Sequence, residues 1–276
     1  MSLDGAALQS PSRTLTHPSA QIHGYDYKFF HAQKIKRHWD TWVKPHVLRQ
    51  MLRSYKFVVF FDADAIVQHL EVPLEFLFNR WNVSANTSIA MPVDTQQVVN
   101  GTDHLSVDSK GKVVLNTGVI VLQNLPHTFE MLQAWAECTT EKRYLGCGQW
   151  KDRWSHEQRA FSEFIRYDFN PDGNNIVVGP KPPLLLHIWS LPRSPINRSG
   201  NRQQEIPCND ANGYPGLVGQ EWVVDDCKGQ FVRHYTVDKS LAKTSTVNAL
   251  MQNVVELLQK QFAVDRKNMV IEEGRS

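Results

Sequence analysis

The sequence predicts an α/β domain with a mostly parallel central sheet flanked by helices. Two observations lead to this expectation. Residues 23–30 alternate like a short strand, residues 39–55 have helical periodicity, and residues 56–67 form a second strand. Strand, helix, strand is the order of a βαβ unit, which places two parallel strands in one sheet. The second strand also consists mainly of β-branched and aromatic residues with almost no polar ones, which is typical of strands covered on both faces.

The totals fit one large domain. We expect residues 1–20 to be a loose lead-in, residues 21–265 to form the domain, and residues 266–276 to be a tail. A formal charge of +2 is too small to indicate a nucleic-acid partner. No run of about 18 apolar residues occurs, so the sequence as written predicts no transmembrane span.

The remaining elements follow from the same periodicities. The helix over residues 39–55 has Asp40 or Thr41 as a cap and Pro45 in its first turn. Further helices are expected at residues 73–81, 128–138 and 246–262 and after Ser155, and further strands at residues 89–93, 112–122 and 231–239. Residues 170–229, rich in Pro, Gly and Asn, are predicted to be irregular. We expect the last helix to pack on the domain and to carry no chemistry.

The cysteines and the N-glycosylation triplets bear on the cellular compartment of the protein. Cys138, Cys147, Cys208 and Cys227 lack metal-type spacing and fall into two local pairs, which is compatible with disulfides or with free core thiols. Four N-glycosylation triplets begin at Asn82, Asn86, Asn100 and Asn197, in predicted loops, and favour a secretory-pathway lumen. Residues 1–17 contain no signal peptide, so either the protein is cytosolic or its targeting segment is missing from this sequence.

Two aspartates end the central strand. Residues two apart in extended chain point the same way, so Asp62 and Asp64 can project into one small volume at the carboxyl edge of the sheet, where α/β folds bind ligands. Two carboxylates there repel one another unless a cation lies between them. The pair therefore predicts a Mg²⁺ or Mn²⁺ site that holds a phosphorylated ligand. The alternative is a strand ending in a turn, where Asp is common.

Three other features have both a functional and an ordinary interpretation. Asn116-Thr117-Gly118 interrupts an apolar strand: Gly118 would let a ligand or another backbone approach and Asn116 offers an amide, or the triplet is a β-bulge. Glu157 and Gln158 are candidates for chemistry or for ordinary helix-start residues. His234 lies within an aromatic strand, where a core histidine is more common than a ligand.

In this order, these pieces resemble the fungal and plant galactosyl-, mannosyl- and xylosyltransferases of the glycosyltransferase family 34 type. Those are retaining enzymes with the GT-A fold, anchored in the Golgi membrane. The resemblance covers about residues 20–245 and rests on Trp42-x-Lys44, Asp62-Ala63-Asp64, Leu115-Asn116-Thr117-Gly118, Glu157-Gln158 and His234 with Lys239.

The resemblance implies a hexose transfer from a nucleotide sugar, UDP-galactose or GDP-mannose, to a glycan acceptor in the Golgi. It assigns Asp62 and Asp64 to Mn²⁺ (or Mg²⁺) on the diphosphate, with His234 as third metal ligand and Lys239 on the diphosphate. The turn from Asn116 to Gly118 and the side chain of Gln158 would line the sugar, and Glu157 is the candidate nucleophile. A cation and a lysine suit this chemistry because negative charge develops on the departing diphosphate.

Two departures from the family pattern matter. The first apolar strand and the membrane anchor are absent, which a truncated gene model or a splice form would explain together, whereas an inactive relative would explain only the strand. The family's acidic pair is His156-Glu157 here, which weakens the assignment of a nucleophile.

Two other functions remain as alternatives. One is an inactive glycosyltransferase-like protein that binds sugar nucleotide or glycan. The other is a haloacid-dehalogenase-type phosphatase with Asp62 as nucleophile and Asp225-Asp226 as the later acidic pair. The phosphatase alternative leaves Asn116-Thr117-Gly118 and His234 unexplained.

Overall fold

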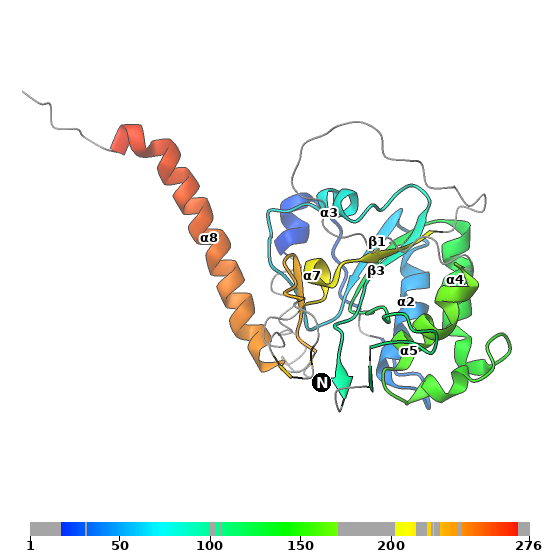
Figure 1. Cartoon of the computed structure of the whole chain (residues 1–276). Coiled ribbons are helices and arrows are strands. Elements are labelled where there is room, and N and C mark those ends of the chain that lie inside the picture. The colour runs from blue at the N-terminus through cyan, green and yellow to red at the C-terminus, as the bar shows by residue number, and fades with distance from the viewer. Residues whose placement is uncertain are drawn as a thin grey trace, which may run out of the picture.

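A four-stranded sheet forms the centre of the computed structural model, which describes residues 18–30, 32–99, 103–104, 106–170, 202–213, 220–221, 223, 227–236 and 239–269 (Figure 1). Its strands, in spatial order, are β1 (Phe57–Phe61), β6 (Val119–Gln123), β3 (Thr87–Pro92) and β7 (Arg202–Ile206). β6 is antiparallel to both neighbours and β3 is parallel to β7. The α/β class is thus confirmed, with three strands in one direction and β6 reversed between them.

Helices cover both faces of this sheet. Ile120 and Leu122 of β6 belong to a core formed with α2 (Val43–Met51) and α4 (Pro126–Ala136), whereas Val119 and Val121 pack toward α3 (Leu74–Arg80) and α7 (Cys208–Ala211). Alternate residues of a strand face opposite sides, so an uninterrupted apolar strand fits a two-sided core. Figure 1 shows the two helix groups on opposite sides of the strands.

Shorter elements extend from this core. Two small sheets pair β2 (Ala65–Val67) with β8 (Val232–His234) and β4 (Val98–Val99) with β5 (Asp103–His104), both antiparallel. α5 (His156–Ala160) continues through a π-helical segment, η5 (Phe161–Ile165), into α6 (Arg166–Asp168). Three 3₁₀ segments complete the described helices before α8: η2 (Asp40–Trp42), η3 (Cys138–Thr140) and η4 (Cys147–Lys151).

The strand predicted over residues 23–30 is wrong. Residues 18–23 are helical and residues 25–30 have no regular secondary structure, so the predicted first strand of the βαβ unit is not formed there. The alternation of this segment does not reflect a buried face, because Phe29 and Phe30 are exposed. Tyr25 instead anchors the segment to α3, through a hydroxyl bonded to Glu75 and to the backbone N–H of Leu74.

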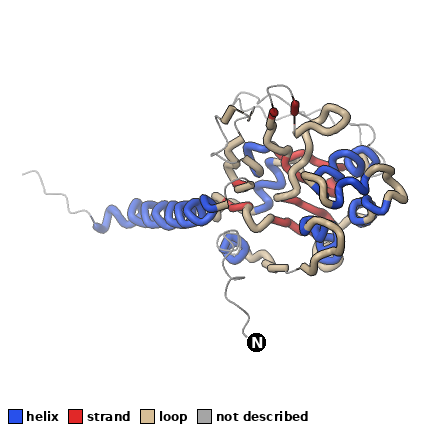
Figure 2. The backbone as a smooth tube through the Cα atoms, turned by 90° about the horizontal axis from the view of Figure 1, so that it is seen from below, coloured by secondary structure: helices blue, strands red, loops and turns tan. Residues whose placement is uncertain are grey.

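The helix expected over residues 246–262 is α8 (Ser240–Met269), but its predicted packing is wrong. Figures 1 and 2 show that it projects away from the domain. Ala242 is buried and Leu250 packs against a small cluster that contains Ile66 and Tyr235. Beyond Leu250, several apolar side chains of α8 are exposed: Met251, Val254, Val255, Leu257, Leu258 and Val264. None of the helices in the described ranges combines the length and the hydropathy that crossing a membrane requires.

The four cysteines pair locally, as Cys138–Cys147 and Cys208–Cys227. Asn82 and Asn86, which begin two of the glycosylation triplets, are exposed between α3 and β3, whereas Thr87 and Ser88 of the second triplet are buried in β3. Asn100 and Asn197 fall outside the described residues.

Two leucines test the contrast between the core and α8. Leu132→Ala on α4 is expected to lower the free energy of unfolding by about 2–5 kcal/mol, because this side chain is fully buried. Leu257→Ala on α8 is the matched control, with an expected change within about 0.5 kcal/mol because its side chain is 64% exposed. Chemical denaturation measures both, and equal losses would contradict the exposed position of α8.

Candidate active site

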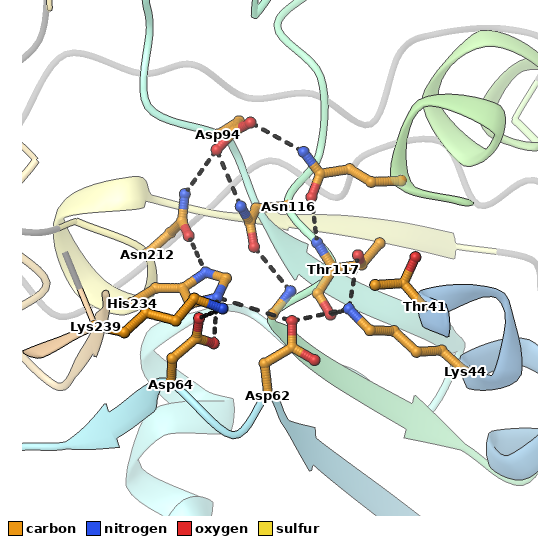
Figure 3. Close-up of polar contacts among 12 residues, drawn as sticks. Thr41, Lys44, Asp62, Asp64, Asp94, Asn116, Thr117, Asn212, His234 and Lys239 are labelled. Atoms are coloured by element: carbon orange, nitrogen blue, oxygen red, sulfur yellow. Dashed lines mark hydrogen bonds and ion pairs between the residues drawn. The ribbon is translucent and has the colours of Figure 1, made fainter. Parts of the chain in front are cut away.

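Two strand ends bring Asp62, Asp64 and His234 together. The N–H of Asp62 donates to the carbonyl of Gly118 (2.8 Å), and the chain then turns so that Ala65 pairs with His234 of β8. The Nε2 atom of His234 lies 3.2 Å from Asp64 Oδ1 and 3.8 Å from Asp62 Oδ2 (Figure 3). One ligand atom from each of these three residues lies within 4.8 Å of the other two.

The bonding of His234 suits a cation ligand. Its Nδ1 lies 3.0 Å from Asn212 Oδ1, an oxygen that only accepts hydrogen bonds, so Nδ1 carries the proton. The orientation of the Asn212 amide is fixed in turn, because its Nδ2 donates to the carbonyl of Val93 and to Asp94 Oδ1. In the neutral ring, the lone pair of Nε2 therefore faces carboxylate oxygens, an arrangement that a cation between them would stabilise. Two carboxylates and one imidazole suit Mn²⁺ or Mg²⁺.

Two lysines place positive charge beside the aspartates. Lys239 Nζ lies 2.9 Å from Asp64 Oδ2, and Lys44 Nζ lies 2.8 Å from Asp62 Oδ2. Burial favours the neutral form of Asp64, but its hydrogen bonds and charge interactions with His234, when that ring is protonated, and with Lys239 outweigh this and hold its pKa below the usual range. Asp64 therefore remains ionised at neutral pH.

Lys44 is the buried member of this set, with 6% of its surface exposed. Burial alone would lower its pKa, but the charges of Asp62 and Glu157 raise the pKa above the usual value, so the ammonium persists. It also donates to the carbonyl and the hydroxyl of Thr117, at 3.2 Å each. Lys44 thus ties α2 to the end of β1 and to the turn before β6.

Glu157 lies on α5 with 2% of its surface exposed. Its Oε1 lies 3.2 Å from Lys44 Nζ and accepts from the Thr117 hydroxyl at 2.9 Å, and its Oε2 accepts from the Thr41 hydroxyl. Both carboxylate oxygens are therefore engaged within the protein.

A second polar cluster centres on Asp94, just after β3. One of its carboxylate oxygens accepts from Asn116 (3.0 Å) and Asn212 (3.2 Å), and the other accepts from Gln158 (2.9 Å). Gln158 in turn accepts from the N–H of Thr117 at 3.1 Å. Because Asn212 also contacts His234, this cluster is joined through His234 to Asp62 and Asp64, as Figure 3 shows.

Gly118 is required by close packing. A Cβ added there would lie 2.1 Å from Cε1 of His234, far inside van der Waals contact. The sequence predicted that a ligand or another backbone would approach this glycine, whereas the group that lies there is the imidazole ring. The predicted strand over residues 112–122 also breaks here: residues 117–118 form a turn, and β6 begins at Val119.

The Cys208–Cys227 disulfide stabilises the chain segment next to Asn212. It joins α7, which directly precedes Asn212, to the segment that enters β8. In the same place, the N–H of Phe231 donates to the carbonyl of Asp210 at 2.9 Å. The disulfide thus helps to hold Asn212 beside His234.

Sequence reasoning missed Asp94 and Asn212 as site residues. Asp94 could have been found, because it follows a predicted strand and so lies at the same edge of the sheet as Asp62. Asn212 had no such signal, since it lies in the stretch predicted to be irregular. Asp225 and Asp226, the acidic pair of the phosphatase alternative, fall outside the described residues.

Comparison with known proteins agrees with this site. The model of the galactosyl transferase GMA12/MNN10 family matches residues 18–237, which include every residue of the candidate active site except Lys239. None of the curated proteins searched matches the chain.

Two solved structures resemble the fold. The crystal structure of a glycosyltransferase involved in the glycosylation of the major capsid of PBCV-1 superposes with a TM-score of 0.51 at 11% identity, over 89% of this chain and 95% of that one. The crystal structure of mouse xyloside xylosyltransferase 1, apo form, superposes with a TM-score of 0.40 at 12% identity, over 82% of this chain and 72% of that one. This likeness is too weak to support a conclusion. The first likeness supports the GT-A fold, and the family match favours a glycosyltransferase over a phosphatase. Because the family model spans most of its length, the chain belongs to the galactosyl transferase GMA12/MNN10 family.

Proposed function

We propose that this protein is a retaining hexosyltransferase that moves galactose or mannose from a nucleotide diphosphate sugar to a glycan acceptor. The observation that carries the proposal is the convergence of Asp62, Asp64 and His234, with the imidazole lone pair directed at the carboxylates. These residues would hold Mn²⁺, which the imidazole favours over Mg²⁺. The bound cation would neutralise charge on the departing diphosphate.

The protein's own residues would share that task. The side chain of Lys239 is 70% exposed, so it is able to turn from Asp64 toward a bound diphosphate. Lys44 is buried and would stay in place, 2.8 Å from Asp62 Oδ2. Because the same oxygen lies 3.8 Å from His234 Nε2, Lys44 would share it with the cation. UDP-galactose and GDP-mannose both suit such a site, because its charges address the diphosphate that the two donors share.

Asp94, Asn116 and Gln158 are proposed to line the sugar. They already restrain one another through hydrogen bonds, and oxygens and amide groups with capacity left can accept from or donate to sugar hydroxyls. A fixed polar cluster loses little freedom when substrate binds, which favours both affinity and orientation.

The contacts of Glu157 favour a route to retention without a covalent enzyme intermediate. A nucleophile must reach the anomeric carbon, whereas both oxygens of Glu157 are buried and bonded to Lys44, Thr41 and Thr117. We therefore assign Glu157 to positioning Lys44 and Thr117, and propose that transfer proceeds on the front face of the sugar.

A Golgi location is proposed on the same basis. The family resemblance indicates it, and the two disulfides suit an oxidising lumen. The exposed positions of Asn82 and Asn86 are compatible with glycosylation there.

Thermal denaturation tests the donor site. UDP or GDP with Mn²⁺ should raise the melting temperature, since ligand at about 100 times its dissociation constant stabilises a protein by about 2.7 kcal/mol. Asp64→Asn should abolish this protection. Glu130→Gln, an exposed carboxylate on α4, should leave the protection intact. Absence of a shift with either nucleotide in the unsubstituted protein would sink the proposal.

Asn212 is expected to position the metal ligand. Asn212→Ala removes the acceptor of the His234 Nδ1 proton, so Mn²⁺ affinity should fall by about 10–100-fold. Isothermal titration with Mn²⁺ alone measures this without any turnover. Asn79→Ala, an exposed asparagine on α3, is the matched control and should bind Mn²⁺ normally. Unchanged affinity in Asn212→Ala would show that His234 needs no such support.

Glu157→Gln separates positioning from nucleophilic catalysis. The amide keeps the shape but leaves Lys44 with less counter-charge, so the free energy of unfolding should fall by about 1–3 kcal/mol. Reduced but measurable transfer is expected to remain. Glu137→Gln at an exposed position serves as control. Detection by mass spectrometry of a glycosyl group attached to Glu157 would contradict the assignment.

A further inference from the structure

An aromatic surface lies next to the polar cluster and has no part in it. Trp154 and Trp39, 79% and 52% exposed, are the most exposed of the described Phe and Trp side chains. His156, which is buried, lies between them. Its ring stacks on Trp39 at 4.6 Å between ring centroids, with planes 3° apart, and meets Trp154 edge-on at 5.6 Å. These three rings form what we term the aromatic platform.

The aromatic platform is joined to the candidate active site by short stretches of chain. His156 immediately precedes Glu157 and Gln158, which contact Lys44 and Asp94 respectively. On the other side, Thr41, two residues after Trp39, donates its hydroxyl to Glu157. Glu157 thus links the chain segment that carries Trp39, through Thr41, to the segment that carries His156.

Backbone contacts make the platform rigid. The N–H of Trp39 donates to the carbonyl of Lys151 and that of His156 to the carbonyl of Arg153, both at 2.8 Å. His156 has a φ of 54°, which is uncommon for a non-glycine residue and persists only where the surroundings enforce it. Burial lowers the pKa of His156, so its ring stays neutral near pH 7.

Exposed indole rings are well suited to binding a sugar ring. A pyranose has one face of C–H groups that can lie on an aromatic ring, and hydroxyls at its rim for neighbouring polar groups. Trp offers a large apolar face and one N–H donor, with little side-chain entropy to lose on binding. The exposed Asp152 and Arg153, next to Trp154 in the chain, give the platform a polar rim. A rim of this kind fits a hydroxyl-rich ligand better than a large apolar protein surface.

We infer that Trp39, His156 and Trp154 form the acceptor subsite, on which a hexose ring of the glycan acceptor stacks. The inference rests on the proposed function, because it assigns the acceptor to the surface formed by the residues that flank Thr41 and Glu157 in the chain. Trp154, as the most exposed ring, would make the main contact. His156 would act by holding Trp39 in place.

Binding of two disaccharides tests the acceptor subsite. We expect α-1,6-mannobiose or cellobiose, titrated by saturation-transfer NMR with nucleotide and with diamagnetic Mg²⁺ in place of Mn²⁺, to bind about tenfold or more weakly to Trp154→Ala. Trp154→Phe should regain most of the affinity. Leu145→Ala removes another highly exposed apolar side chain, 87% exposed, and should have no effect. Trp154 is exposed, so its replacement should not disturb folding.

Nucleotide protection in the same variants separates the two ideas. If Mn²⁺ and nucleotide still protect Trp154→Ala from heat while disaccharide affinity falls, the acceptor subsite is supported. If protection is normal but disaccharide affinity is unchanged, or neither disaccharide binds the unsubstituted protein, the subsite is overturned and the donor site stands. A shift from dimer to monomer in Trp154→Ala, with sugar affinity unchanged, would assign the surface to a second copy of the chain and overturn the inference. Loss of nucleotide protection in the unsubstituted protein would instead remove the proposed function.

Discussion

Two carboxylates at the end of one strand repel each other, and the polar architecture of this domain is arranged around that repulsion. Asp62 and Asp64 lie on the turn between β1 and β2, and each has a lysine within 2.9 Å. The imidazole of His234 approaches from β8. The nitrogen atoms that meet in this small volume come from Lys44 on α2, His234 on β8 and Lys239, the residue before α8. Without that positive charge, or a cation, the strand end would be unstable in this conformation.

The supporting residues form two linked layers. Nearest the helices, Lys44, Glu157 and Thr117 form a buried charged group that holds α2, α5 and the turn before β6 together. Nearer β3, Asp94 accepts hydrogen bonds from three amides that belong to separate parts of the chain. Asn212 belongs to this second layer and also contacts His234, so a change at the polar cluster would affect the position of the imidazole. Such coupling is what a donor that spans cation, diphosphate and sugar would require.

Part of this structure follows from the sequence, and the limits have physical reasons. The strand at Phe57–Phe61 and the helices at Leu74–Arg80 and Pro126–Ala136 were predictable because their apolar periodicities are set by burial. The nearness of Asp62 to His234 followed from the family resemblance, because periodicity does not show which distant strands pair. The reversed direction of β6 could not be predicted either, since it depends on tertiary pairing rather than on the strand's own side chains. Residues 25–30 and α8 were predicted to pack more closely than they do. Each has an apolar pattern, but such a pattern only identifies a surface suited to burial and does not ensure that another element covers it.

The missing side chain at Gly118 limits how this protein can diverge. The ring of His234 occupies the space that any Cβ at position 118 would need. A substitution at position 118 would therefore be tolerated only together with a smaller residue at position 234, which would remove the imidazole. The dependence runs in one direction: position 118 cannot gain a side chain while the histidine is present, and related chains that abandon the histidine would be the ones free to lose the glycine.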